Sequence, residues 1–449
     1  MANSYSRSAA DKERATSSSL GQIYDLITGD EDARVCKDIP EAACRYQPRN
    51  FFAYLVSNVF TKVADELTSA RLILPWLLGV LGAPAAFTGF LVPIREAGVL
   101  LPQLLVAAYI RRLPRRGGAW FLGTGLCAVA VLLMLLPVTQ LSGAAAGWAV
   151  LGLVTLFSLA KGICSVSAKD VLGKTVSKTR RGTLMGYSAG VAGTVTLAIG
   201  IYVEWYAAAG RDGGVFVGFL LAAGLLYLAS IAVFAFIVEE AGATEGGGNA
   251  IRVALESLSV LRSDPAFRRF VIARSLLLSV ALVLPFYALL AQRHSDQVTG
   301  LGLLIIAGGL ATSLSSPLWG RLGDRSSRLV MAVAAAAAGV TGIATGVLAA
   351  AGAACMDSVW SWAVVFFLIA AFHNGVRLGR KTYLVDLSTQ QTRATYVAVS
   401  NTVIGAAMFV GGAFGVIADI LSPAVVIGTL GLLALVSAAY ILRLPEVSG

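Results

Sequence analysis

Charged residues are scarce in this chain of 449 residues. Asp, Glu, Lys and Arg together make up 13%, against about a quarter in soluble globular proteins. Hydrophobic residues make up 57%, and the mean hydropathy is +0.77. A helix needs about 20 apolar residues to cross a bilayer, so the chain has room for about twelve spans. This composition excludes an ordinary soluble protein and predicts one embedded in the lipid bilayer.

Cysteine and histidine are also scarce. The five cysteines form no CxxC pair and there are two histidines, so neither a disulfide framework nor a zinc site is predicted. The sequence has no nucleotide loop of the GxxxxGK(S/T) kind and no set of nucleophile, base and oxyanion donor. We therefore expect no enzymatic activity, no cofactor and no metal. A channel is disfavoured because no selectivity filter is readable.

The net charge of +10 could indicate a nucleic-acid partner, but basic residues beside apolar runs are typical of membrane orientation. The first 50 residues contain no apolar core of signal-peptide length. With this N-terminus in the cytoplasm, the basic residues fall in alternate loops, and only Arg211 and Arg293 lie in outer loops. We expect a monomer in the inner membrane with both termini cytoplasmic. The inner-loop residues are Arg111, Arg112, Arg115, Arg116, Lys178, Arg180, Arg181, Arg321, Arg325 and Arg328.

Twelve apolar runs divide into two sets of six. The predicted domains are an N-terminal extension (1–50), a first six-helix bundle (51–239), a cytoplasmic linker (240–268) and a second bundle (269–449). In the extension, Leu20, Ile23, Leu26 and Ile27 form a short amphipathic piece. The extension is either a plug or regulator at the cytoplasmic ends of the helices, or a disordered or surface-lying tail. The predicted spans are 52–80, 85–110, 118–138, 146–170, 183–206, 214–238, 269–292, 298–318, 329–352, 359–385, 394–418 and 422–443.

The two sets also resemble each other at a constant offset of 212 residues. Lys169 falls on Lys381, Arg181 on Arg393 and Ser188 on Ser400. The same offset places the loop that begins at Ala108 on the loop that begins at Gly320. One offset that aligns two separate regions indicates a duplicated six-helix unit.

The loop between the eighth and ninth predicted spans resembles the G-x-L-x-D-R-x-x-R motif of the major facilitator superfamily. Its matching residues are Gly320, Leu322, Asp324, Arg325 and Arg328. The resemblance implies an all-α membrane protein in which two pseudo-symmetric bundles of six helices surround a central cavity. It also implies alternating access by rocking of the bundles, with cavity walls from spans 1, 4, 7 and 10.

The sequence departs from the family pattern at three places. Arg112 stands at the position of the loop aspartate in the first copy, and Ser158 stands at the position of an arginine in the fourth span. The fifth span lacks the Gly-Pro pair of an antiporter signature. These departures weaken assignment to the drug exporters.

Asp324 is a candidate gating residue. By pseudo-symmetry it would pair with Arg380 or Lys381 and with the start of the fifth span near Gly182, and so hold one state of the cytoplasmic gate. The alternative is a solvated aspartate in a tight turn. The predicted gating set is Gly320, Asp324, Arg325, Arg328, Arg380 and Lys381.

Ionisable groups within predicted spans are functional candidates because hydrocarbon does not solvate them. In the first span, five polar residues recur at helical spacing on one face. Two of them, Asp65 and Glu66, lie near mid-membrane and are the candidates for proton coupling. The alternative is internal pairing of Glu66 with Lys62, or of either acid with Arg95. The five residues are Asn58, Lys62, Asp65, Glu66 and Ser69.

Two further polar stripes lie in the fourth and tenth spans. The cations outnumber the acids, which favours an organic anion as substrate. The alternative is that Lys169, Arg380 and Lys381 extend to the cytoplasmic surface and serve topology. The stripes are Ser158, Lys161, Ser165 and Lys169 in the fourth span, and His373, Arg377, Arg380 and Lys381 in the tenth.

His373 is a candidate proton relay or, alternatively, a neutral hydrogen-bonding residue. Arg71, Arg95 and Glu96 are predicted to pair within the first bundle. The predicted function is a proton-coupled secondary transporter of a small anionic solute. The alternative is a flippase or exporter of lipids or amphiphiles, because the charges lie in spans 1, 2 and 4 while spans 7 and 8 are apolar.

Overall fold

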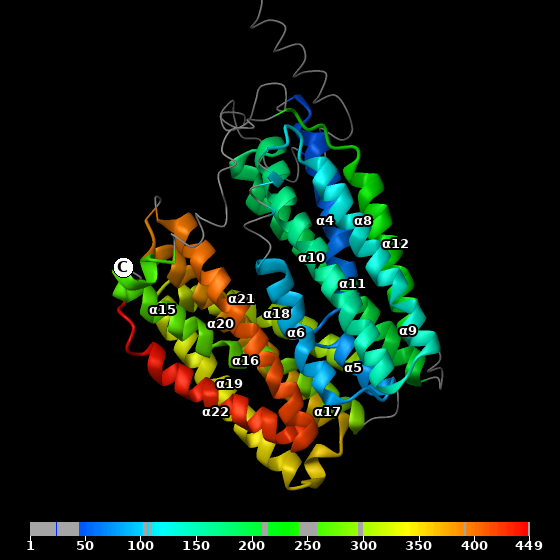
Figure 1. Ribbon diagram of the computed structural model, residues 1–449, viewed down its shortest axis with the longest axis vertical. Helices are drawn as coiled ribbons and strands as arrows, with labels where there is room; N and C mark the ends of the chain where they lie inside the picture. Colours follow the sequence, from blue (N-terminus) through cyan, green and yellow to red (C-terminus); the bar gives the residue numbers. More distant parts are fainter. Residues whose placement is uncertain are drawn as a thin grey trace, which may run out of the picture.

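The computed structural model describes residues 24, 45–101, 106, 109–110, 112–208, 214–241, 258–294, 300–389 and 392–447. Within these ranges the regular secondary structure is helical throughout (Figure 1). The amphipathic piece of the N-terminal extension, Arg111, Arg211 and most of the predicted linker lie outside the described residues. The structure therefore does not test the roles predicted for these segments.

The first half of the chain forms six membrane-length units, of which the first and third are divided into two helices. The helix α6 ends at Leu100, ten residues before the predicted end of the second span, and every other bound lies within five residues of the prediction. The helices are α4 (Gln47–Leu67) with α5 (Ile73–Val80), α6 (Ala85–Leu100), α8 (Gly117–Leu133) with α9 (Leu135–Gln140), α10 (Gly143–Thr175), α11 (Lys178–Ala208) and α12 (Val215–Phe234).

The second half repeats this order. A short helix, α14 (Val260–Ser263), precedes it, and one turn of 3-10 helix (Ala354–Met356) lies before α20. The seventh unit consists of three consecutive helices. The helices are α15 (Pro265–Leu276), α16 (Leu278–Leu282) and α17 (Leu284–Arg293), α18 (Leu301–Gly323), α19 (Ser327–Ala350), α20 (Val359–Leu387), α21 (Arg393–Ile420) and α22 (Pro423–Ile441).

Ten of these units are long and apolar enough to cross a membrane. The pair α4 and α5, which carries several charges, and the shorter α6 complete the set of twelve. The predicted fold class is confirmed: the chain folds as two six-helix bundles of a membrane protein.

The duplication is visible in matched side-chain contacts. Arg181, at the start of α11, donates to the Gly173 carbonyl oxygen at 2.7 Å and closes the turn from α10. Arg393, 212 positions later, donates to the Val385 carbonyl oxygen at 3.5 Å and closes the turn from α20. The repeat offset read from the sequence therefore corresponds to a repeated structural role.

A second pair of matched contacts joins the third and sixth units of each bundle. The backbone N–H of Arg116 donates to Glu239 at 2.8 Å, and the Arg328 guanidinium lies 3.2 Å from a carboxylate oxygen of Glu446. Both arginines stand where a loop leads into a spanning helix. Each bundle thus ends on a carboxylate that fixes the start of its third spanning unit.

The first spanning unit is broken between residues 67 and 73. Pro75 has no N–H to donate to the carbonyl four residues earlier, which disfavours a continuous helix through Arg71. The Thr68 hydroxyl donates back to the Ala64 carbonyl oxygen and marks the last turn of α4. Ser69 therefore lies in the break, and the predicted helical face ends at Glu66.

Several helices of the second bundle begin after a residue that caps them. The side chains of Ser326 and Ser422 accept N–H donors of α19 and α22. Asp264 accepts the N–H of Ala266 and of Phe267 at the start of α15. Partial burial opposes ionisation, but these hydrogen bonds and one from the Tyr396 hydroxyl hold the pKa of Asp264 below its usual range.

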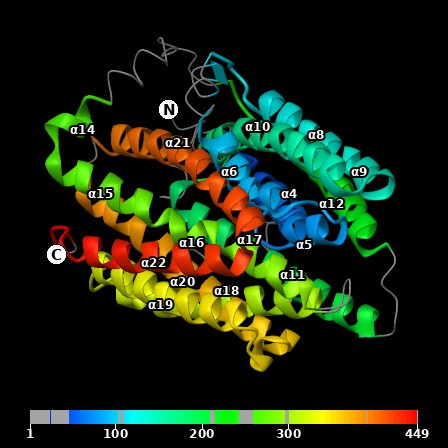
Figure 2. The same cartoon turned by 60° about the horizontal axis from the view of Figure 1, so that its bottom comes forward.

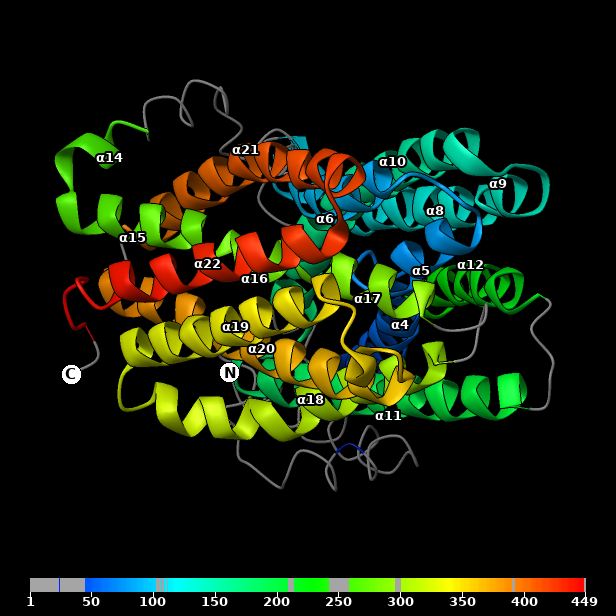
Figure 3. The ribbon, with the colours of Figure 1, turned by 90° about the horizontal axis from the view of Figure 1, so that it is seen from below.

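The two bundles meet along α6 with α21 (Figure 2) and along α11 with α18 (Figure 3). A third contact joins α5 to α17. We call the side of the molecule with these close contacts the contact side. The opposite side, where α4 begins and α22 ends, is the terminal side, toward which the bundles diverge (Figure 1).

Candidate functional site

Four helices of the first bundle bring polar side chains together around Asp65. This residue lies near the end of α4, half-buried, with its side chain 32% exposed. Arg95 comes from α6, Lys161 from the middle of α10 and Tyr227 from α12. The helical spacing of the polar stripes on α4 and α10 turns Asp65 and Lys161 toward each other.

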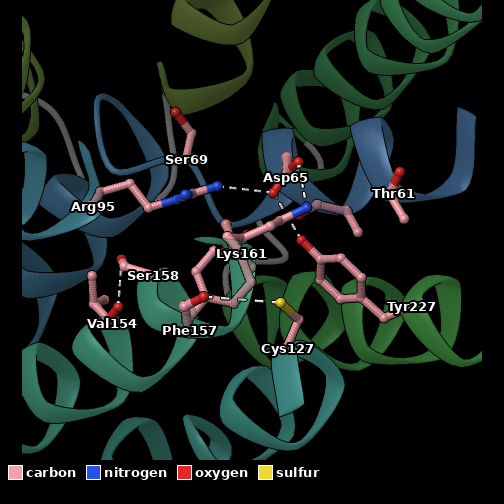
Figure 4. A network of polar contacts seen from close by, with 12 residues as sticks. Thr61, Asp65, Ser69, Arg95, Cys127, Val154, Phe157, Ser158, Lys161 and Tyr227 are labelled. Carbon is pink, nitrogen blue, oxygen red and sulfur yellow. Dashed lines mark hydrogen bonds and ion pairs between the residues drawn. The ribbon is translucent and has the colours of Figure 1, made fainter. Parts of the chain in front are cut away.

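Asp65 accepts hydrogen bonds from three side chains (Figure 4). The donors are Lys161 Nζ at 2.8 Å, an Arg95 guanidinium nitrogen at 3.0 Å and the Tyr227 hydroxyl at 2.8 Å. One carboxylate therefore joins two cations, and the cluster carries a net positive charge. Charge-assisted hydrogen bonds of this kind are the stronger ones in proteins.

Aromatic rings support both cations. The Arg95 guanidinium lies 4.7 Å from the centroid of the Phe157 ring, and Lys161 Nζ lies 5.0 Å from the centroid of the Tyr227 ring. A cation over an aromatic face is attracted by the ring quadrupole. The rings therefore add to the stabilisation of the two positive charges.

A cavity of about 290 Å³ opens beside this cluster. Its wall combines hydroxyl, amide and charged groups with aromatic surface, which suits a small molecule with polar and apolar parts. The structure brings five of the predicted cavity and coupling residues into this wall: Asn58, Lys62, Asp65, Lys161 and Ser165.

Three other predicted cavity residues, Ser69, Ser158 and Arg377, lie outside this wall. The Ser158 hydroxyl donates to the Val154 carbonyl oxygen of its own helix at 2.6 Å and is fully buried (Figure 4). The close approach of Gly98 on α6 covers it. Ser69 lies in the break after α4, where its hydroxyl accepts the Arg71 backbone N–H at 3.4 Å.

The second acid of the stripe, Glu66, is exposed, and its carboxylate makes no hydrogen bond with any residue that the structure describes. Its charged neighbours are Asp65, Arg71, Arg377 and Lys62. Glu96 on α6 forms an ion pair with Arg71 at 2.9 Å. Within the first bundle, Arg71 and Arg95 are paired with Glu96 and Asp65, and neither forms an ion pair with Glu66.

The second bundle contributes cations from α20. Arg377 and Arg380 are half-buried, Lys381 is exposed, and none of the three has a hydrogen-bond or ion-pair partner in the described part of the chain. Glu96 of the first bundle attracts Arg380 electrostatically, without an ion pair between them in the described residues. His373 is 5% exposed and is not part of the cavity wall beside Asp65.

Matched polar contacts fix the first unit of each bundle to the fifth. Asn58 on α4 donates to the Ser188 hydroxyl at 2.9 Å. In the second bundle, the Arg274 guanidinium donates to the Ser400 hydroxyl and to Asn401 Oδ1, the latter at 3.0 Å. The serines are the pair aligned by the 212-residue offset, and Arg274 places one more cation in the second bundle.

The predicted gating residues lie at the terminal side. Asp324 ends α18, is exposed, and has no ion pair within the ranges described. Arg328 is bound within its own bundle, to Glu446 and to the Leu444 carbonyl oxygen. Gly320 and Arg325 flank Asp324. In this conformation, with the bundles apart on the terminal side, Asp324 does not contact Arg380 or Lys381.

Sequence reasoning missed Tyr227, which completes the Asp65 cluster, and Thr124 of the cavity wall. A tyrosine in the middle of an otherwise apolar span was the available signal, because a buried phenol hydroxyl requires a hydrogen-bond partner. Thr124 contacts Cys164 Sγ at 3.4 Å. The described residues contain no group of three His, Cys, Asp or Glu side chains that could hold a metal ion.

This chain matches a family model and curated proteins of two Mycobacterium species. The family model of the Major Facilitator Superfamily matches residues 51–345 and 275–448. An uncharacterized protein of Mycobacterium tuberculosis is 26% identical over 418 residues, which cover 87% of this chain and 77% of that protein. An uncharacterized protein of Mycobacterium bovis matches with the same values.

Solved structures share the fold at low sequence identity. A POT family transporter in complex with a thioalcohol-conjugated peptide has a TM-score of 0.70 at 14% identity, covering 90% of this chain and 98% of that one. A D-xylose-proton symporter has a TM-score of 0.66 at 13% identity, covering 89% and 99%. The xylose transporter of E. coli, in a partially occluded inward-open conformation, has a TM-score of 0.63 at 14% identity, covering 90% and 99%.

Proposed function

Since the chain belongs to the Major Facilitator Superfamily of transporters, we propose that it moves a small organic anion across the cytoplasmic membrane by alternating access, coupled to protons. The family match, the fold and the apolar helices support a multi-pass membrane transporter of this family. The substrate class, the coupling ion and the orientation are our proposals.

The proposed orientation places the terminal side in the cytoplasm. Arg112, Arg115, Lys174, Arg321 and Arg325 all lie on that side, where the loops join the helices. Cytoplasmic loops carry the excess of lysine and arginine in polytopic proteins. With this orientation the bundles diverge toward the cytoplasm and contact each other toward the exterior (Figure 1).

The observation that carries the anion proposal is the pair of unpartnered arginines on α20. Arg377 and Arg380 are half-buried, and the second bundle supplies no carboxylate that pairs with them within the described residues. Arg274 adds a third positive charge to this bundle. A guanidinium binds a carboxylate or phosphate through two parallel hydrogen bonds, so these residues suit an anionic head group.

The proposed proton carrier is Glu66, with Asp65 as the charge that sets the field around it. Asp65 is already bound by Lys161, Arg95 and Tyr227. Glu66 is exposed beside it, in the field of Arg377. Protonation of Glu66 removes a negative charge near Arg377, so the electrostatic potential at Arg377 becomes more positive and an anion binds there more tightly. Proton binding and substrate binding are linked in this way.

The experiment is uptake of radiolabelled organic anions into proteoliposomes at two external pH values. We expect Arg377→Gln to reduce uptake more than tenfold, because the variant cannot form a charge-assisted bidentate interaction with the anion. Arg443→Gln is the matched control, since Arg443 is an exposed arginine at the end of α22. Equal uptake by parent and Arg377→Gln, for every anion transported by the parent, would refute the proposed site.

The coupling role has its own variant. We expect Glu66→Gln to retain exchange of substrate across the membrane while losing the stimulation of uptake by a proton gradient. Asp324→Asn tests the predicted gate instead: it should change labelling of single cysteines on the terminal side without removing binding. Retained proton stimulation in Glu66→Gln would exclude this residue as the carrier.

A second candidate function is transport of an amphiphile. It is favoured by an open groove of about 650 Å³ along the terminal half of α11, lined by residues from Thr183 to Val195. The lining is mainly apolar with glycines at Gly186 and Gly190, and could receive an acyl chain. Thermal stabilisation by lysolipids but by no soluble anion would favour this candidate over the first.

A further inference from the structure

Two of the spanning helices at the bundle interface, α6 and α18, begin without a side-chain cap of their own. Pro84 precedes α6 and Gly300 precedes α18, and neither residue has a side chain that can accept a hydrogen bond. By contrast, serines cap α19, α20 and α22 within the second bundle. The first N–H groups of α6 and α18 therefore depend on acceptors from elsewhere.

In both cases the acceptor is a carboxylate of the opposite bundle. Asp419, at the end of α21, accepts the backbone N–H of Ala85 at 2.5 Å and that of Ala86 at 2.9 Å. Glu204, near the end of α11, accepts the backbone N–H of Leu303 at 3.1 Å. Each carboxylate also faces the positive end of a helix dipole, which favours its charge.

The two contacts are related by the pseudo-symmetry of the fold. In each bundle the fifth spanning helix supplies the acid, and the second spanning helix of the other bundle supplies the N–H groups. Asp419 lies three residues beyond the position that the 212-residue offset gives for Glu204, which is close to one helical turn. The same face of both helices therefore carries the acid.

Close backbone packing surrounds both contacts. A Cβ atom on Gly415 would lie 2.5 Å from the Ala86 carbonyl oxygen, and one on Gly302 would lie 2.5 Å from the backbone nitrogen of Glu204. Only glycine permits these approaches. Rocking of one bundle against the other on the contact side must therefore break the capping hydrogen bonds and separate the packed glycines together.

We propose that Asp419 and Glu204 are inter-bundle caps that hold the transporter closed on its contact side and so set the energy required to open it there. The caps exist only while the bundles are in contact, because neither helix has a substitute acceptor among its own capping residues. Loss of one cap is expected to shift the equilibrium between the two states about five- to tenfold toward opening on the contact side. Loss of both is expected to multiply the shifts, since the two sites are independent.

The test is the distance distribution between spin labels on the contact side, measured without substrate so that the result does not depend on the proposed anion. The labels replace Leu141 of the first bundle and Leu421 of the second, both exposed. The cysteines at 36, 44 and 355 are first changed to serine, whereas Cys127 and Cys164 are buried and remain. We expect Asp419→Ala and Glu204→Ala each to increase the population with the longer distance.

Two comparisons distinguish a cap from a general effect of removing an acid. Asp357→Ala removes an exposed carboxylate on the same side, outside the interface, and should leave the distribution unchanged. Asp419→Asn retains an acceptor oxygen and should give a smaller shift than Asp419→Ala. Distributions that are identical in parent, Asp419→Ala and Glu204→Ala would overturn the proposal, as would an equal shift in Asp357→Ala.

If an alanine variant does not give a monodisperse protein, Gly302→Ala tests the same interface from the other helix. Its added methyl group meets the backbone of α11 and should also increase the open population. An unchanged distribution in Gly302→Ala would show that this interface does not restrain the contact side. Failure of anion uptake in every variant, with the expected distance changes present, would refute the proposed substrate and leave the inter-bundle caps standing.

Discussion

Replacement of Asp65 by asparagine tests whether the cluster in the first bundle acts as one electrostatic unit. The substitution keeps the size of the side chain and one acceptor oxygen, but it removes the negative charge between Lys161 and Arg95. Both cations are largely buried, with side chains 13% and 21% exposed. They cannot reach bulk water without leaving the positions that α10 and α6 give them.

The magnitude follows from the hydrogen bonds that Asp65 accepts. Hydrogen bonds between charged groups contribute about 1.5–3 kcal/mol each, and Asp65 accepts two of them and one from a neutral phenol. Its side chain is 32% exposed, so solvent screening reduces these contributions, and asparagine retains one acceptor. We expect the free energy of unfolding to fall by about 2–3 kcal/mol.

With the cysteines at 36, 44 and 355 changed to serine, Cys127 and Cys164 provide the assay, because both are free and buried. A dye that fluoresces on reaction with thiols reports their exposure as the first bundle unfolds on heating. By the scale of soluble domains, the expected loss lowers the melting temperature by several degrees. Asp324→Asn is the matched control: Asp324 is exposed and outside any ion pair that the structure describes, so its melting temperature should stay within about a degree of the parent.

A second substitution, which removes the charge of Lys161, tests whether the two residues act together. In Asp65→Asn with Lys161→Gln, the carboxylate and one cation are absent together, so part of the lost stability should return. A melting temperature in Asp65→Asn equal to that of the parent would refute the reasoning. So would a double variant whose loss equals the sum of the two single losses, since independent sites do not form one cluster.

Three further predictions concern single contacts. Tyr227→Phe should cost about 1 kcal/mol, less than Asp65→Asn, since it removes one neutral donor and leaves both cations paired; thermal unfolding in the same assay measures it. Arg181→Gln and Arg393→Gln should each destabilise their own bundle by a similar amount, because the two arginines close equivalent turns. Limited proteolysis measures how fast each half of the chain is cleaved. Faster cleavage in only one of the two variants would contradict the prediction. The pKa of Asp264 is depressed in the folded state, so the stability that its charge contributes is present above the unfolded pKa and is lost as the pH falls through the folded pKa. In Asp264→Asn, the melting temperature should therefore depend less on pH in that acidic range. A melting temperature with the same pH dependence as that of the parent would contradict this.

The sequence predicted the fold well because each spanning helix must satisfy its backbone hydrogen bonds within itself. Apolar length therefore located eleven of the twelve units to within five residues, even where α15, α16 and α17 divide one span, whereas α6 ends ten residues before its predicted bound. The break after Leu67 was missed, although Pro75 was visible. The effect of a proline on the preceding turn depends on whether neighbouring helices compensate for the missing hydrogen bond.

The candidate site was predicted in part. Helical spacing placed Lys62, Asp65 and Lys161 on faces that do line one cavity. Spacing alone could not distinguish Ser158, whose hydroxyl is covered where α6 packs on α10. It also could not supply Tyr227, because the partner of a phenol hydroxyl in an apolar span comes from another helix.

The sequence by itself determined that the chain is a membrane protein of two repeated six-helix units, because hydropathy and the 212-residue repeat are properties of local segments. Only the tertiary structure decided which charges are bound to one another. It paired Asp65 with Arg95 and Lys161, left Arg377 and Arg380 without partners in the described residues, and gave the caps of α6 and α18 to the opposite bundle. These pairings depend on how whole helices pack across large separations in the chain, and no local pattern in the sequence encodes that packing.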